Sequence, residues 1–268
     1  MKKNFKFGVI GAGFMATAII KGVINSGLVN SNDILVSDVY EPALNNIKKL
    51  GVNVTTDNKY LVGSSEFILF AVKPQSLTTV LDGIKDCSPE KIISIMAGIK
   101  RQRIKNVFPN AKIARCMPNT PCSIGYGAVG IDLSDFSNKQ DVEFIKSLFT
   151  SFADVVLLDE SKMNAVTGVS GSAPAYFYLF LQGVIEAGVS NGLSYDDAKI
   201  LATKTMIGAG NMVLQNNEKS LDELINAVCS KGGTTIEAVN VYKANDLSNI
   251  TKKAVDACVK RSTELENV

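Results

Sequence analysis

The sequence contains no histidine, and its five cysteines form no C-x-x-C pair. Zinc sites in proteins are usually built from histidine and paired cysteine ligands, so we expect no bound metal. The cysteines are odd in number and scattered along the chain, a pattern typical of free thiols. Because free thiols persist in a reducing compartment, we expect a cytoplasmic protein.

A strong net charge and long apolar runs are also absent. The formal net charge is only +2 at pH 7, which gives no reason to expect nucleic acid or an anionic membrane as a partner. The most apolar later segment, residues 173–189, contains Gln182 and Glu186 and is too short and polar to span a bilayer. The apolar run near the N-terminus is interrupted by three glycines, which favours a first strand over a signal peptide.

A glycine-rich stretch stands out at residues 7–16, FGVIGAGFMA, between an apolar run and residues of helical period. It is the G-x-G-x-x-A variant of the dinucleotide fingerprint. Gly11 permits a tight turn, Gly13 lets a pyrophosphate approach the backbone, and Ala16 lets the helix pack closely on the strand. The alternative is a tight strand–helix turn with no ligand. From the fingerprint we predict cofactor contacts at Gly11, Gly13, Phe14 and Met15.

Short apolar runs alternate with helical segments over the first part of the chain. The predicted strands cover residues 7–10, 34–37, 52–54, 67–72, 92–95, 113–116, 125–131 and 153–158. This alternation predicts an α/β fold with a Rossmann-type, doubly wound, mainly parallel sheet. From Asp159 onward the period is helical almost throughout. We therefore predict a dinucleotide-binding domain at residues 1–158 and an all-helical domain at residues 159–268.

Several candidate residues lie where predicted strands end, the edge of such sheets that binds ligands. The stretches 72–74 and 96–98 follow two of these strands, and Asn119 lies on a loop stiffened by two prolines. Asp38 follows the strand 34–37 and suits the ribose hydroxyls. Its charge would repel a 2′-phosphate, which favours NADH. A helix N-cap or a turn carboxylate is the alternative interpretation of Asp38.

Two segments of the helical half combine glycine with hydroxyl side chains, residues 170–172 and 232–235. At a helix start, such segments supply backbone N–H groups and hydroxyls that bind anions such as a carboxylate. Two helix-capping turns without a ligand are the alternative. A third glycine-rich segment, residues 208–212, follows no strand and is interpreted as a close helix–helix contact.

Taken together, these motifs resemble the pyrroline-5-carboxylate reductase family over essentially the whole chain. The resemblance rests on residues 8–16, 71–75 and 115–121 in the first half, and on residues 165–176 and 232–236 in the second. It implies reduction of 1-pyrroline-5-carboxylate to L-proline with NADPH or NADH. It also implies a Rossmann domain followed by an all-helical dimerisation domain, with homodimers or larger homo-oligomers built from them.

The resemblance also implies site residues. It places the substrate carboxylate on the turn formed by Gly233, Thr234 and Thr235 and near Ser170 and Gly171, with Thr235 close to the ring nitrogen and Glu218 nearby. The residues implied to line the cofactor are Asn58, Ala71, Val72, Lys73, Pro74, Ala97 and Gly98. The chain departs from the family pattern at Lys231, where proline is usual, and at Ala173, where glycine is usual. It also departs at Ser220–Leu221, in place of a His-Pro pair, and at Asp38.

Two other functions stay open from the sequence. A β-hydroxyacid dehydrogenase would resemble the first half, but its Lys-x-x-Asn catalytic pair does not occur after residue 160. A hydroxy-acid dehydrogenase also usually needs a histidine that exchanges a proton near neutral pH. A nicotinamide-nucleotide sensor would bind the cofactor and regulate a partner, without need of two anion-binding turns.

Overall fold

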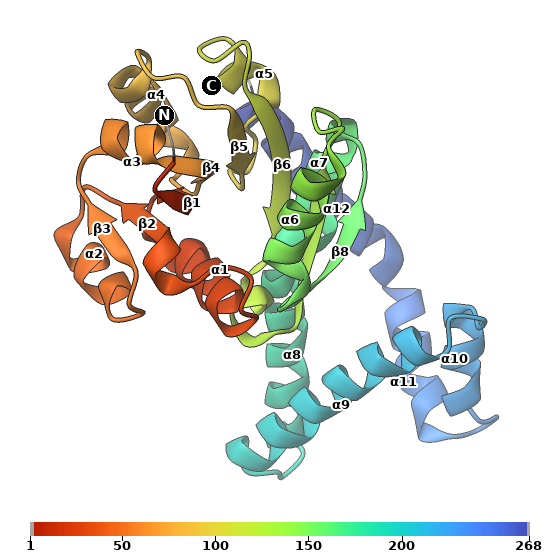
Figure 1. Cartoon of the computed structure of the whole chain (residues 1–268). Helices are drawn as coiled ribbons and strands as arrows, with labels where there is room; N and C mark the ends of the chain where they lie inside the picture. The colour runs from red at the N-terminus through yellow and green to blue at the C-terminus, as the bar shows by residue number, and fades with distance from the viewer. Residues whose placement is uncertain (1–2, 267–268) are drawn as a thin grey trace. The chain divides into compact units, whose positions relative to one another are not determined.

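The computed structural model describes residues 3–266, whose strands form one eight-stranded sheet in the order β3-β2-β1-β4-β5-β6-β7-β8 (Figure 1). The strands are β1 Phe5–Ile10, β2 Ile34–Ser37, β3 Asn53–Thr55, β4 Ser65–Phe70, β5 Lys91–Ser94, β6 Lys112–Pro118, β7 Gly127–Asp132 and β8 Ala153–Leu157. All neighbouring strands are parallel except the antiparallel pair β6–β7. The predicted mainly parallel, doubly wound sheet is therefore confirmed.

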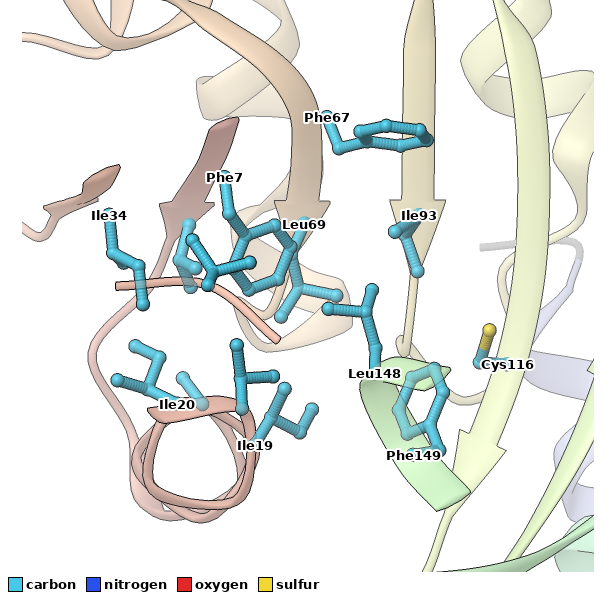
Figure 2. Packing of buried hydrophobic residues seen from close by; sticks show 14 of the residues in the cluster. Phe7, Ile19, Ile20, Ile34, Phe67, Leu69, Ile93, Cys116, Leu148 and Phe149 are labelled. Carbon is cyan, nitrogen blue, oxygen red and sulfur yellow. The ribbon is translucent and has the colours of Figure 1, made fainter. Parts of the chain in front are cut away.

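Helices cover both faces of the sheet. They are α1 Phe14–Asn25, α2 Glu41–Lys48, α3 Asn58–Ser64, α4 Leu77–Ile84, α5 Arg101–Lys105 and α6 Lys139–Thr150. Buried side chains of α1, α2 and α6 pack with Phe7 and Leu69 on one face, as Figure 2 shows for part of this cluster. Those of α3, α4 and α5 pack with Ile68 and Phe70 on the other face. Because successive strand residues point to opposite faces, the apolar runs of β1 and β4 supply both cores.

The chain forms two compact units. The first runs as far as Ser172 and also includes the chain from Cys258 onward, whereas the second comprises Ala173–Ala257. The change to a helical period in the sequence predicts a division earlier, after residue 158. The first unit extends further because the buried side chain of Arg115 on β6 forms ion pairs with Glu160, at 3.3 Å, and Glu266, at 3.5 Å. These ion pairs connect Glu160, which follows β8, and Glu266, which follows the last helix, to strand β6 of the sheet.

The helical part contains α7 Met163–Val166, a π-helical segment η5 Thr167–Gly171, α8 Ala173–Ser190, α9 Tyr195–Gln215, α10 Leu221–Val228, α11 Thr234–Ala244 and α12 Leu247–Leu265. In the second unit α8 packs against α9, and the rings of Phe180 on α8 and Tyr242 on α11 lie 6.0 Å apart. Many large apolar side chains of α8 and α9 are nevertheless exposed. Among the described residues, no helix is long and apolar enough to cross a membrane.

Candidate active site

The fingerprint glycines have different surroundings. Gly11 has a φ of +103°, and a Cβ there would lie 2.7 Å from the carbonyl oxygen of Ala71, so this position requires glycine. Gly13 is the N-cap of α1 with an ordinary φ of −73°, and a Cβ there would meet nothing within 4 Å. No side chain caps α1, so the N–H groups of its first turn lack a side-chain acceptor. This is the surrounding that a dinucleotide pyrophosphate requires.

The next two fingerprint residues differ in where their side chains lie. Phe14 is exposed beside the glycine turn, whereas Met15 packs against the apolar cluster beneath α1. Met15 therefore faces this site only through its backbone. The sequence motif does not distinguish the two positions, because that depends on which side of α1 meets the sheet.

Asp38 lies directly against the glycine turn. Its Oδ2 accepts a hydrogen bond from the backbone N–H of Ala12 at 2.7 Å, and its Oδ1 accepts from that of Tyr40 at 2.8 Å. The N-cap of α2 is Tyr40, so the N-cap interpretation of Asp38 is wrong. The contact with Tyr40 is an Asx-type turn, but the contact with Ala12 brings the carboxylate to the place where β1 and β2 both end.

Asn58 lies at the same edge of the sheet. The hydroxyl of Ser37, the last residue of β2, donates to Asn58 Oδ1 at 2.6 Å. Asp57 caps α3 by accepting from the N–H groups of Lys59 and Tyr60, so Asn58 is the first residue of a well-anchored helix. The structure thus brings Asn58 and Asp38 to the carboxyl end of one strand.

A groove of about 780 Å³ adjoins the glycine turn between α1 and α2. Its lining includes Gly13 and Phe14, and also three residues outside the predicted site, Thr17, Lys21 and Tyr40. Phe14, Thr17 and Lys21 recur at helical spacing, so the face of α1 that continues from the fingerprint could have been predicted. Tyr40 could not, because its place depends on the turn made by Asp38.

The segments after β4 and β5 also reach this edge. Ala71 N–H donates to the carbonyl of Ile10 at 2.9 Å, which joins the chain after β4 to the end of β1. Lys73 is the N-cap of a short 3-10 helix, η2 Pro74–Ser76. Val72 packs partly into the second apolar cluster. Ala97 and Gly98 form a turn after β5, so the predicted cofactor residues 71–74 and 97–98 follow adjacent strands.

Asn119 and Ser170 meet across 51 residues of sequence. Asn119 Nδ2 lies 3.2 Å from Ser170 Oγ, while Asn119 Oδ1 accepts from the backbone N–H of Ala128 at 3.1 Å. Ser170 belongs to η5 and not to a helix start, and the N–H of Ser172 donates to the carbonyl of Thr167. Residues 170–172 thus lie where η5 ends and α8 begins, at Ala173, but the N–H of Ser172 is already bonded within the chain.

In the second unit the segment 232–235 does begin a helix. Gly232 has a φ of +73°, Gly233 is the N-cap of α11, and no side chain caps that helix. The first N–H groups of α11, which include those of Thr234 and Thr235, lack intrahelical acceptors. Thr235 is exposed. Glu218 lies in the turn between α9 and α10, also exposed.

The two buried thiols, Cys116 and Cys122, do not suit nucleophilic catalysis. Burial raises the pKa of Cys116 far above its ordinary value and also raises the pKa of Cys122, so both stay protonated near neutral pH. Within residues 3–266, no group of three or more cysteine, aspartate or glutamate side chains is placed to hold a metal ion.

Comparison with known proteins decides the family. Residues 160–265 match the model for pyrroline-5-carboxylate reductase dimerisation, and residues 6–98 match that for NADP oxidoreductase, coenzyme F420-dependent. The pyrroline-5-carboxylate reductase of Methanosarcina acetivorans is 34% identical over 267 residues, covering 98% of each chain. The chain belongs to the pyrroline-5-carboxylate reductase family.

Solved structures of the pyrroline-5-carboxylate reductase family superpose on nearly the whole of this chain. The enzyme of Coxiella burnetii superposes with a TM-score of 0.88 at 31% identity, covering 98% of this chain and 99% of that one. The Plasmodium falciparum pyrroline carboxylate reductase, solved with NADP bound, superposes with a TM-score of 0.87 at 28% identity, covering 99% and 100%. The family expected from the sequence motifs is thus confirmed.

Proposed function

We propose that the protein reduces 1-pyrroline-5-carboxylate to L-proline with NADH or NADPH, the last step of proline biosynthesis. The observation that carries the proposal is the open, uncapped glycine turn at Gly11–Gly13, in a chain that matches this family from end to end. When bound there, the reduced nicotinamide supplies the hydride.

The cofactor residues that we propose all lie in the first unit. The pyrophosphate is held by the backbone at Gly11, Gly13, Phe14 and Met15, and the ribose by Asp38. Asn58, residues 71–74, Ala97, Gly98 and Asn119 complete the cofactor surface. Support for this set is the shared strand edge reached by β1, β2, β4 and β5, together with the adjacent groove along α1.

For the substrate carboxylate we propose the first turn of α11, at Gly233, Thr234 and Thr235, with Ser170 and Gly171 as further contacts and Glu218 nearby. An uncapped helix start preceded by Gly232, with its positive φ, suits an anion, and the exposed Lys231 adds a positive charge two residues before Gly233.

The absence of histidine fits this chemistry. A cyclic imine carries its own basic nitrogen and arrives protonated, so its carbon is already electrophilic. The protein therefore needs mainly to hold and orient the ring. We propose that the Thr235 hydroxyl hydrogen-bonds the ring nitrogen. Thr235→Ala is then expected to lower kcat/KM for 1-pyrroline-5-carboxylate. Thr235→Ser keeps a hydroxyl and is expected to retain most of the wild-type kcat/KM.

The deciding experiment mixes the protein with each reduced cofactor and 1-pyrroline-5-carboxylate and follows the loss of reduced-nicotinamide absorbance. Turnover with formation of proline supports the proposal. Oxidation of the reduced cofactor only with a 3-oxoacid, the oxidised form of a β-hydroxyacid, would instead indicate the related dehydrogenases, and cofactor binding without any oxidation would indicate a nucleotide sensor.

We further propose that the chain forms a homodimer, or larger assemblies built from dimers, through its second unit. The support is an apolar groove of about 880 Å³ on α8 and α9, whose lining includes Phe177, Leu201 and Met206. Both Phe177 and Leu201 are more than half exposed in the single chain. A cytoplasmic location is proposed from the five free cysteines.

A further inference from the structure

The amide of Asn119 has only one orientation that satisfies its neighbours. Its Oδ1 faces the backbone N–H of Ala128 at 3.1 Å and the thiol of Cys122 at 3.6 Å. A backbone N–H is an obligatory donor, so the atom facing it must be the oxygen. The Nδ2 group consequently faces Ser170 Oγ, at 3.2 Å, and donates to it.

This orientation determines what the Ser170 hydroxyl does. A hydroxyl has one hydrogen to donate and two lone pairs, and Asn119 occupies one of the lone pairs. Within residues 3–266 no carbonyl or carboxylate oxygen accepts the Ser170 hydrogen. The side chain of Met117 packs beside Gly171, the next residue, where an added Cβ would lie 2.5 Å from Cε of Met117. The partly buried hydroxyl is thus held with its proton available to a ligand.

We propose that Asn119 is a positioning residue, which acts through Ser170 to direct the serine proton to the carboxylate of the substrate. The inference rests on the proposed function. Without the Asn119 donor the serine hydroxyl is free to rotate and to donate to a carbonyl one turn earlier, as helical serines do. The acid group is then held less firmly. The Thr235 hydroxyl, proposed to orient the ring nitrogen, is unchanged.

A double-mutant cycle tests this role. Asn119→Ala and Ser170→Ala are each expected to raise KM for 1-pyrroline-5-carboxylate about tenfold, the usual order for a lost hydrogen bond to a charged group. At saturating cofactor the double variant is expected to have the same KM for 1-pyrroline-5-carboxylate as Ser170→Ala alone, because Asn119 acts on the substrate only through the serine. Ser170→Ala, at a residue with no proposed cofactor contact, is expected to leave the KM for the cofactor unchanged.

Asn138→Ala is the matched control. Asn138 also accepts from backbone N–H groups, those of Gln140 and Asp141, but it caps α6. Any change that Asn138→Ala causes in KM for 1-pyrroline-5-carboxylate is expected to be independent of Ser170. In the Asn138→Ala, Ser170→Ala double variant the two fold-changes in KM therefore multiply. If thermal unfolding shows that Asn119→Ala is not folded, Asn119→Asp is used in its place. The aspartate carboxylate still accepts from the backbone N–H of Ala128 but cannot donate to Ser170. The effect of Asn119→Asp on KM must then be larger in the wild-type background than in the Ser170→Ala background.

Wild-type turnover is measured first, so that the two failures are distinguished. No turnover of 1-pyrroline-5-carboxylate overturns the proposed function and this inference with it. In the second failure the protein turns over 1-pyrroline-5-carboxylate, but Asn119→Ala raises KM equally in the wild-type and Ser170→Ala backgrounds, or leaves KM unchanged. That result overturns only the role of Asn119.

Discussion

Gly11 and Gly13 show that two residues of one motif serve different purposes. Gly11 needs its positive φ and its closeness to Ala71, so Gly11→Ala is expected to destabilise the fold by about 1–3 kcal/mol. Gly13 has open space and an ordinary φ, so Gly13→Ala is expected to keep the melting temperature and weaken cofactor binding. Thermal unfolding and cofactor titration of both variants measure this. Equal loss of stability in both would contradict the assignment.

Asp38 controls the choice of cofactor in our proposal. A carboxylate held by the N–H groups of Ala12 and Tyr40 would repel a 2′-phosphate. Asp38→Ser is therefore expected to raise the ratio of kcat/KM for NADPH over NADH about tenfold, equivalent to about 1.4 kcal/mol. Glu41→Gln removes a nearby exposed charge that binds neither amide, and it should change the ratio less. A ratio unmoved by Asp38→Ser would leave Asp38 as a turn residue.

At the scale of elements, a charge cluster joins β1, β4, β5 and α6. Lys91 binds Asp141 at 2.7 Å and Glu66 at 3.1 Å, and Lys6 binds Glu66 at 2.9 Å. Burial acts to raise the pKa of Glu66, but the hydrogen bonds and charges of Lys6 and Lys91 outweigh it and lower that pKa below its ordinary value of 4.5. A carboxyl group with a lowered pKa in the folded state stabilises above the unfolded value and loses that stabilisation as pH falls.

The cluster therefore predicts an acid-sensitive fold. The melting temperature is expected to fall as pH drops below about 4.5, and Glu66→Gln should flatten this dependence while lowering the melting temperature at neutral pH. Circular dichroism melts across this range provide the measurement. Asp86→Asn is the control, because the Lys59–Asp86 pair is exposed and such pairs contribute little. A wild-type slope that Glu66→Gln leaves unchanged would contradict the prediction.

At the scale of the whole molecule, the exposed apolar side chains of α8 and α9 predict self-association. Leu201→Lys places a charge in the apolar groove and is expected to shift the protein to smaller species in light scattering coupled to gel filtration. Tyr60→Lys, at an exposed aromatic residue on α3 of the first unit, is the control and should leave the mass unchanged. A Leu201→Lys protein that keeps its mass would show that this groove is not the interface.

The sequence by itself determined the sheet, most helices and the cofactor turn. Each depends on a signal within a few residues, such as the apolar run of β2, the Asn138 cap of α6, or the order Gly-x-Gly after a strand.

Only the tertiary structure decided how distant segments meet. Asp38 contacts Ala12 across 26 residues, Asn119 contacts Ser170 across 51, and Arg115 contacts Glu266 across 151. These contacts set the orientation of the Ser170 hydroxyl and return the end of α12 to the first unit. No local period encodes them, because they arise where the packed sheet brings side chains from separate strands and helices together.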